Sequence, residues 1–147
     1  MVIALDTDVL TVRHVYRRDR RRTTNERFLQ EGHAYGLGVT IYNLLELCGI
    51  AQPHGYSARE IFRHYTTSST VTVLYPPVLL DSEEAYWRAH NEALLSRIER
   101  GMRLGDAVIL WVTETCGCEA LVTWNTRHFV GKTELPVLTP AEWLERF

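Results

Sequence analysis

Lysine is nearly absent from this chain of 147 residues. Of its sixteen basic residues, all but one are arginine. The formal net charge is −2, so the overall charge does not indicate a general nucleic-acid binder. Six of the arginines fall between positions 13 and 22, and the rest of the chain is therefore distinctly acidic. Positive charge is concentrated in one short stretch, which makes that stretch a candidate binding surface.

Long apolar runs are absent and cysteine is scarce. No stretch approaches the roughly 18 apolar residues that span a bilayer, and no basic segment precedes an apolar run at the amino end. Cys48, Cys116 and Cys118 form an odd set without the two-residue spacing of zinc and redox motifs, which favours free buried thiols. We therefore expect a soluble, cytoplasmic protein with no membrane partner.

A glycine-rich phosphate loop and a Gly-x-Ser-x-Gly elbow are absent as well. Residues 36–38 read Gly-Leu-Gly, but no third glycine follows at the spacing that a dinucleotide-binding fold requires. An enzyme acting on a small molecule is therefore the least favoured functional class.

Short apolar segments alternate with helical patterns along the chain. With this length and 46% hydrophobic residues, we expect residues 1–147 to form a single domain. Apolar and β-branched segments predict strands at residues 2–5, 35–40, 71–75, 120–123 and 136–138. Strands alternating with helices predict an α/β fold with a central parallel sheet and helices on both of its faces.

The predicted helices have recognisable starts and apolar faces. A capping residue followed three positions later by Glu is found at Thr23, Ser57, Asp81 and Thr139. Inner faces at helical spacing are predicted from Ile41, Leu44, Leu45 and Cys48, and from Trp87, Leu94, Leu95 and Ile98. Residues 107–112 are apolar on every side, so the helix that opens at Asp106 should be buried.

Oxygen-bearing side chains follow or flank three of the predicted strands. They are Asp6 and Asp8 after the first strand, Glu46 on the helix after the second, and Asp106, Thr123 and Asn125 around the fourth. Because the carboxyl ends of parallel strands meet at one edge, where ligands bind in such sheets, we expect these side chains to converge. Clustered carboxylates repel one another and are costly to bury unless a cation compensates them. The pattern predicts an oxygen-ligated Mg²⁺ or Mn²⁺ site suited to phosphodiester chemistry.

Each of these residues also has a structural interpretation. Asp106 and Asp8 are good helix caps, and Asn125 suits a turn. Glu46 resembles a solvated helix residue, Thr123 an ordinary strand residue, and His128 a surface histidine with proton transfer as a minor alternative. Asp6 is harder to explain structurally, because it directly follows an apolar strand.

The same residues resemble a PIN domain, and the VapC-type ribonuclease toxins in particular. The resemblance covers nearly the whole chain in order. It is carried by residues 5–10, Thr40 with Glu46, residues 105–107, residues 121–129 and the closing residues 138–144. It implies a three-layer α/β/α sandwich and a metal-dependent endoribonuclease, usually a homodimer, that a cognate antitoxin inhibits.

Carried over by position, the resemblance implies that Asp6, Glu46 and Asp106 hold the metal and that Thr123 supports them. The fourth acidic position of the family is Asn125 here, which puts a second metal in doubt. Asp8 stands where the family usually has a small polar residue, and it partly restores the missing charge. Asn125 also favours an alternative function, a catalytically weak or inactive PIN-like module that binds RNA or protein.

The arginine-rich stretch is the candidate surface for RNA or for the antitoxin that competes with it. An acidic site repels a phosphate backbone, so a nuclease of this charge needs local positive charge, and the planar guanidinium suits phosphate. A solvated surface helix is the alternative interpretation. The RNA-binding candidates are Arg13, Arg17, Arg18, Arg21, Arg22 and, next to the fourth strand, Arg127.

Overall fold

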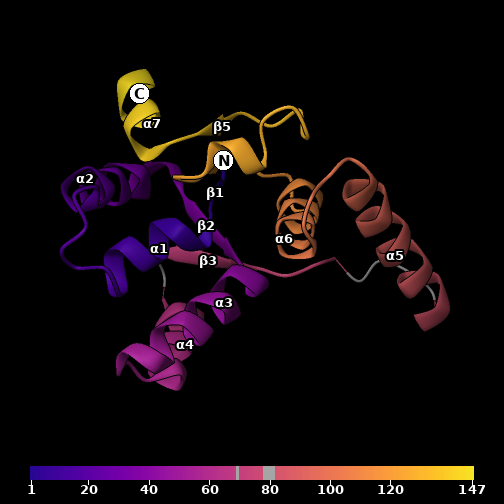
Figure 1. The fold of residues 1–147 in the computed structure, drawn as a ribbon, viewed down its shortest axis with the longest axis horizontal. Coiled ribbons are helices and arrows are strands. Elements are labelled where there is room, and N and C mark those ends of the chain that lie inside the picture. The colour runs from indigo at the N-terminus through magenta and orange to yellow at the C-terminus, as the bar shows by residue number, and fades with distance from the viewer. Residues whose placement is uncertain (69, 78–81) are drawn as a thin grey trace.

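The strands form one five-stranded parallel sheet. A computed structural model describes residues 1–68, 70–77 and 82–147, and its strand order is β3-β2-β1-β4-β5 (Figure 1). The strands are β1 (Ile3–Leu5), β2 (Leu37–Thr40), β3 (Val71–Leu74), β4 (Ala120–Val122) and β5 (Val137–Leu138). Every neighbouring pair is parallel, so the predicted sheet is confirmed, with each strand one or two residues shorter than expected.

The central strand β1 sets the edge at which the candidate residues meet. Leu5, its last residue, is paired with Val39 of β2 and Val122 of β4. The residues that follow these three strands therefore leave the sheet at the same level. All residues of β1, β2 and β4 are buried, as expected for parallel strands covered on both faces.

Helices cover both faces of the sheet. They are α1 (Thr7–His14), α2 (Arg22–Gly32), α3 (Ile41–Ala51), α4 (Ala58–Thr67), α5 (Glu83–Glu99), α6 (Leu104–Thr115) and α7 (Pro140–Arg146). Ile3 and Leu5 belong to a core cluster shared with α1, α2, α3, α4 and α7, whereas Ala4 belongs to a second cluster shared with α5 and α6. Side chains alternate between the two faces of a strand, so the two clusters lie on opposite faces. The predicted three-layer α/β/α sandwich is confirmed.

Helix starts follow the sequence prediction at two of the four positions. Ser57 accepts a hydrogen bond from the Glu60 amide, and Thr139 and Glu142 form a complete capping box. The prediction for Thr23 is wrong: α2 begins at Arg22, after Arg21 in helical conformation, and no side chain caps it. Thr23 therefore already lies inside the helix. Asp81 lies outside the described residues, and the side chain that caps α5 is Ser82.

Two predicted apolar faces are partly wrong. On α3 the buried set includes Leu47 and Ala51, whereas Leu45 is 52% exposed, because α1, α4 and α6 pack around different sides of this helix. On α5 only Leu94 is buried. Its predicted neighbours Trp87, Leu95 and Ile98 are exposed, because α6 is the main element that packs against α5, which forms the periphery of the molecule (Figure 1).

The apolar helix α6 is buried as predicted over most of its surface. Ala107, Ile109, Leu110 and Val112 are buried, while Trp111 is half-buried beneath α5. The helix begins at Leu104, two residues before the predicted start, which puts Asp106 in the first turn.

The three cysteines are free, and two of them, Cys48 and Cys118, are buried, while Cys116 is partly exposed. Within residues 1–68, 70–77 and 82–147, no helix is long and apolar enough to cross a membrane.

Candidate functional site

Asp6 is fixed at the centre of the carboxyl edge. It follows β1 directly and caps α1, where its Oδ1 accepts a hydrogen bond of 2.8 Å from the Thr7 amide. Asn43 Nδ2 donates to the same oxygen over 3.2 Å, and Thr123 Oγ1 donates to Oδ2 over 2.8 Å. Asp6 is thus a helix cap and also an acid tied to β4 and α3.

Asp8 connects the start of α1 to the loop after β4. Its Oδ2 accepts from the backbone amides of Trp124 at 2.9 Å and Asn125 at 3.1 Å, and it lies 3.0 Å from Thr123 Oγ1. Its Oδ1 is buried and, among the described residues, has no hydrogen-bond partner. The single hydroxyl proton of Thr123 is therefore shared between Asp6 and Asp8, and one oxygen of Asp8 stays available.

Glu46 is held by a chain of polar side chains that the sequence analysis did not identify. Thr7 Oγ1 donates to Glu46 Oε2 over 2.5 Å, and Asn43 Nδ2 donates to Thr7 Oγ1 over 2.9 Å. Thr40 Oγ1 in turn donates to Asn43 Oδ1 over 2.6 Å. Asn43 could have been identified from the sequence, because it is an amide in the otherwise apolar first turns of a helix that directly follows a strand.

Asp106 and His128 form the opposite side of the site. Asp106 Oδ2 lies 3.2 Å from His128 Nδ1, which belongs to the short helix η3 (Thr126–His128) after β4. His128 therefore contacts a predicted metal ligand, and the proton-transfer role that was its minor alternative stays a prediction. Asn125 precedes η3 and is exposed.

The predicted metal ligands border one pocket of about 200 Å³. Its lining includes Asp6, Asp8, Glu46, Asp106, Asn125 and His128. Thr123 is fully buried and bonded to two of the carboxylates. We call this hollow the acidic pocket. The topology thus brings together residues that are separated by up to 122 positions in the sequence, from Asp6 to His128.

The electrostatics of the acidic pocket disfavour additional negative charge. Burial, together with the neighbouring Asp8 and Glu46 charges, raises the pKa of Asp6 to about 7, although the hydrogen bonds from Thr123 and Thr7 lower it. Burial also raises the pKa of Asp8, against the hydrogen bonds from Trp124, Thr123 and Asn125.

The donor chemistry of the pocket fits a hard divalent cation. Its acidic groups offer oxygen only, and both the buried, unpartnered Oδ1 of Asp8 and the raised pKa of Asp6 indicate a deficit of positive charge. In the part of the chain that the structure describes, no three His, Cys, Asp or Glu side chains are close enough together to hold one ion. The pocket therefore matches a divalent cation in the type of its donor atoms and in its negative charge.

The arginine-rich stretch forms the connection between α1 and α2, and it is not the continuous surface helix of the alternative interpretation. Arg21 is already engaged: it donates to both carboxylate oxygens of Asp19, and its guanidinium carbon lies 5.5 Å from the centroid of the Trp124 ring. Arg13 Nη1 lies 3.9 Å from Glu26, and Arg22 donates to the Arg13 carbonyl oxygen.

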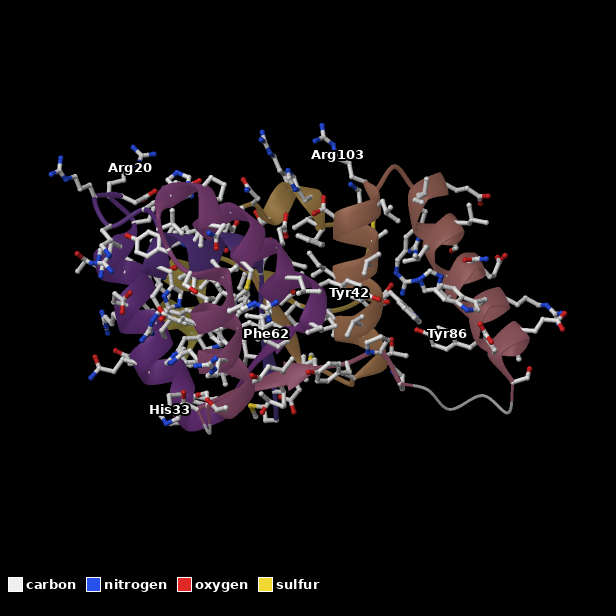
Figure 2. The ribbon with its side chains drawn as sticks, turned by 90° about the horizontal axis from the view of Figure 1, so that it is seen from below. Arg20, His33, Tyr42, Phe62, Tyr86 and Arg103 are labelled. Atoms are coloured by element: carbon white, nitrogen blue, oxygen red, sulfur yellow. The ribbon has the colours of Figure 1, made fainter. Side chains whose placement is uncertain are left out.

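The other arginines of this region are exposed. Arg17, Arg18 and Arg20 take part in no ion pair with a described residue. Figure 2 shows Arg20 projecting on the same side of the molecule as Arg103, which immediately precedes α6. Arg127 lies on η3 beside His128 and is also exposed, so basic side chains are present near both sides of the acidic pocket.

No protein-family model and no curated protein sequence matches this chain, but solved structures do. VapC20 from Mycobacterium tuberculosis, a sarcin-ricin loop cleaving toxin, matches with a TM-score of 0.58 and 22% identity over 81% of this chain and 86% of that chain. A chain of VapBC2 from Rickettsia felis, bound to a promoter DNA fragment, matches with a TM-score of 0.64 and 13% identity over 93% and 97%. FitAcB from Neisseria gonorrhoeae matches with a TM-score of 0.57 and 15% identity over 95% and 98%.

The chain has a PIN-like fold. The resemblance to VapC-type toxins that the sequence indicated is therefore confirmed at the level of the fold. The structural match covers more than four-fifths of the chain. At these identities the likeness concerns architecture, and the function of the acidic pocket has to be argued from its residues.

Proposed function

We propose that this chain is a metal-dependent endoribonuclease, the toxin of a toxin-antitoxin pair. The observation that carries the proposal is the convergence of Asp6, Asp8, Glu46 and Asp106 on one pocket at the carboxyl edge of a PIN-like sheet. VapC20, which shares this fold, is a toxin that cleaves the sarcin-ricin loop. We further propose that residues 1–147 act as one domain in the cytoplasm.

In this proposal Asp6, Glu46 and Asp106 would hold Mg²⁺ or Mn²⁺, with Asp8 as an additional oxygen donor. Because the described side chains are not grouped closely enough around one point, their carboxylates would have to draw together when the ion binds. The ion, when bound, supplies an activated water and neutralises charge that develops on the phosphate. Thr123 keeps Asp6 and Asp8 aligned by sharing its hydroxyl proton between them. Asn125 lines the pocket without adding charge.

The remaining side chains position these acids or bring the substrate to them. Thr7 fixes the Glu46 carboxylate, and His128 contacts that of Asp106. The exposed arginines attract the RNA backbone towards a pocket whose own charge repels it. Among the RNA-binding candidates, Arg17 and Arg18 are best placed for this role, because Arg13 and Arg21 already contact carboxylates.

The direct test is cleavage of RNA by the purified chain in the absence of any antitoxin. Total cellular RNA is incubated with and without Mg²⁺ or Mn²⁺, and the cut ends are mapped, with an Asp106→Asn variant prepared identically as the control. We expect cleavage at defined positions that needs the metal and disappears in the variant. Cleavage that persists in the folded variant or in a chelator would overturn the proposal.

We also propose a cognate antitoxin as partner. Two of the similar structures, VapBC2 and FitAB, are bound to DNA fragments, in one case from the promoter of the pair. An antitoxin that covers the acidic pocket would compete with RNA for the same arginines.

A homodimer is proposed from the exposed apolar face of α5. Trp87, Leu95 and Ile98 recur at helical spacing and are 49%, 52% and 40% exposed, and an apolar patch of this kind often marks an interface between protein chains. The mass in solution, measured by light scattering, should fall from dimer to monomer when Leu95 and Ile98 are both changed to Glu. Val130→Glu, at an equally exposed apolar residue outside α5, is the matched control. A monomeric parent protein would refute the dimer without affecting the nuclease assay.

A further inference from the structure

A second hollow adjoins the acidic pocket. It measures about 480 Å³ and is lined by residues 15–19, which follow α1, and by Tyr56. Tyr16 lines both this hollow and the acidic pocket, so the two share a wall. We call Tyr16, His54, Tyr56, Arg17 and Arg18 the aromatic shelf.

The rings of the aromatic shelf are held at its surface by backbone geometry. Tyr16 is 43% exposed, and its amide donates to the Thr11 carbonyl oxygen at the end of α1. Its ring meets His54 edge to face, with the centroids 5.9 Å apart. A left-handed turn at Gly55, with a φ of 87°, reverses the chain between His54 and Tyr56. An edge-to-face pair does not stack its rings on one another, so flat ring surface remains for another partner.

Positive charge lies against this aromatic surface. The guanidinium carbon of Arg17 is 5.6 Å from the centroid of the Tyr56 ring, a cation–π contact that leaves its N–H groups available. Arg18 follows directly, and neither arginine pairs with a carboxylate in the described part of the chain. Arg21, by contrast, is neutralised by Asp19. The shelf therefore offers planar surfaces and unpaired guanidinium groups together.

This combination matches the two parts of a nucleotide. Aromatic rings stack on the flat face of any base, and arginine binds phosphate through its planar fork. Among the described residues that line the hollow, Val15 is the one aliphatic residue, which argues against a docking groove for an apolar helix. A base inside a duplex is covered on both faces by its neighbours, so only an unpaired nucleotide can present its face to Tyr16.

We propose that the aromatic shelf is a subsite for one unpaired nucleotide next to the phosphodiester bond that is cut. Its base stacks on Tyr16 and its phosphate is held by Arg17 and Arg18, while the adjoining phosphodiester enters the acidic pocket. This inference rests on the proposed nuclease function and assigns the residues that would bind the nucleotide next to the cut bond. Tyr16 would then supply affinity that a duplex, whose bases are covered on both faces, cannot gain.

The test measures binding, so that it does not depend on cleavage. A fluorescently labelled, short single-stranded oligoadenylate and a duplex RNA of the same length are titrated by anisotropy into the full chain carrying Asp106→Asn. Tyr16→Ala is introduced in this background, with Tyr16→Phe to restore the ring. Tyr75→Ala, at an exposed tyrosine away from the shelf, is the matched control. Circular dichroism establishes that every variant is folded.

We expect Tyr16→Ala to weaken single-strand binding by about tenfold, the size of one missing base–aromatic stack, and to leave duplex binding unchanged. Tyr16→Phe and Tyr75→Ala should stay within about twofold of the parent, because stacking needs the ring and not the hydroxyl. The salt dependence should be the same in Tyr16→Ala as in the parent. In the double variant Arg17→Ala with Arg18→Ala, the slope should flatten by about 0.7 for each phosphate that is no longer neutralised.

The results separate this inference from the nuclease proposal. A folded Tyr16→Ala variant with parental single-strand affinity, or with an equal loss for both RNAs, overturns the subsite even if the active chain cleaves RNA. A loss of affinity for a cognate antitoxin without any change in RNA binding also overturns it, because the shelf would then serve a protein. Selective loss of single-strand binding supports the subsite whether or not cleavage is detected.

Discussion

The acidic pocket and the aromatic shelf share Tyr16 but are built in opposite ways. The carboxylates of the pocket lie directly after a strand or on helices, and hydrogen bonds to other elements fix the orientation of Asp6 and Glu46. The shelf lies on the connections that follow α1 and α3, with Tyr16, Arg17 and Arg18 exposed. Groups that position a reacting atom are best held by rigid elements, whereas groups that capture a flexible polymer need access.

The two regions also treat charge differently. In the pocket, burial raises the pKa of both Asp6 and Asp8, and the neighbouring Asp8 and Glu46 charges raise that of Asp6 further, so the site favours a cation. On the arginine-rich connection, some arginines pair with a carboxylate, such as Arg21 with Asp19, whereas other, exposed arginines pair with no carboxylate of a described residue. The position of a charge relative to the sheet, rather than the net charge of the chain, therefore decides what each region can bind.

The largest expected effect concerns the pocket. Asp6→Asn, Glu46→Gln and Asp106→Asn should each reduce the cleavage rate by at least about 100-fold, because loss of one oxygen ligand misplaces the ion. Single-turnover cleavage of a defined RNA measures the rate, and circular dichroism checks the fold. A folded variant with near-parental activity would show that its residue is not a ligand.

A smaller effect distinguishes the two groups of arginines. Changing Arg17, Arg18 and Arg20 to Ala should flatten the salt dependence of single-strand binding by about 0.7 for each phosphate left without an arginine. The matched set Arg13, Arg21 and Arg22 should change the slope less, because these side chains already bond to other groups. Equal slopes for the two sets, measured by anisotropy between low and moderate salt, would contradict this distinction.

A substitution at Asn125 would add negative charge to the acidic pocket instead of removing a ligand from it. Asn125→Asp adds a carboxylate to its lining and should tighten Mn²⁺ binding by Coulomb attraction, by roughly severalfold. Calorimetric titration of the isolated chain measures the affinity. Unchanged or weaker binding would mean that this side chain does not face the ion, and Asn91→Asp on α5 controls for net charge alone.

The smallest effect concerns α1, which joins the two regions, with Asp8 in its first turn and His14 as its last residue. Burial lowers the pKa of His14 from 6.5 to about 4, and the neighbouring Arg13 charge adds to this. Because the folded pKa lies below the unfolded value, the stability contributed by neutral His14 is fully present above pH 6.5 and is lost as the pH falls towards 4.

The free energy of unfolding in urea should therefore fall between pH 7 and pH 4 by roughly 1 kcal/mol more for the parent than for His14→Gln. The difference is this small because partial exposure of His14 weakens the effect of its pKa shift. His33→Gln, at an exposed histidine, is the control and should keep the parental pH dependence. If His14→Gln also keeps it, the buried imidazole does not limit stability in acid.

Several features could be predicted without the structure: the alternation of strands and helices, the parallel sheet, the capping box at Thr139, and the positions of Asp6, Glu46 and Asp106 at one edge. The strands, the helices and the capping box follow from periodicity and capping patterns, which are local properties of the chain. Asp6 was indicated by its place directly after a strand, whereas Glu46 and Asp106 were assigned to the same edge with the help of the resemblance to PIN domains. The concentration of positive charge between positions 13 and 22 was also evident, although paired and unpaired arginines could not be separated.

Which side chains touch depends on the tertiary packing. The bond between Thr7 and Glu46 spans 39 positions, and that between Thr123 and Asp6 spans 117, so no local pattern predicts them. The exposed face of α5 depends on how many elements pack against that helix, which its own periodicity does not contain. Likewise, Tyr16, in the connection after α1, lines two hollows at once, a consequence of packing that residue spacing does not predict.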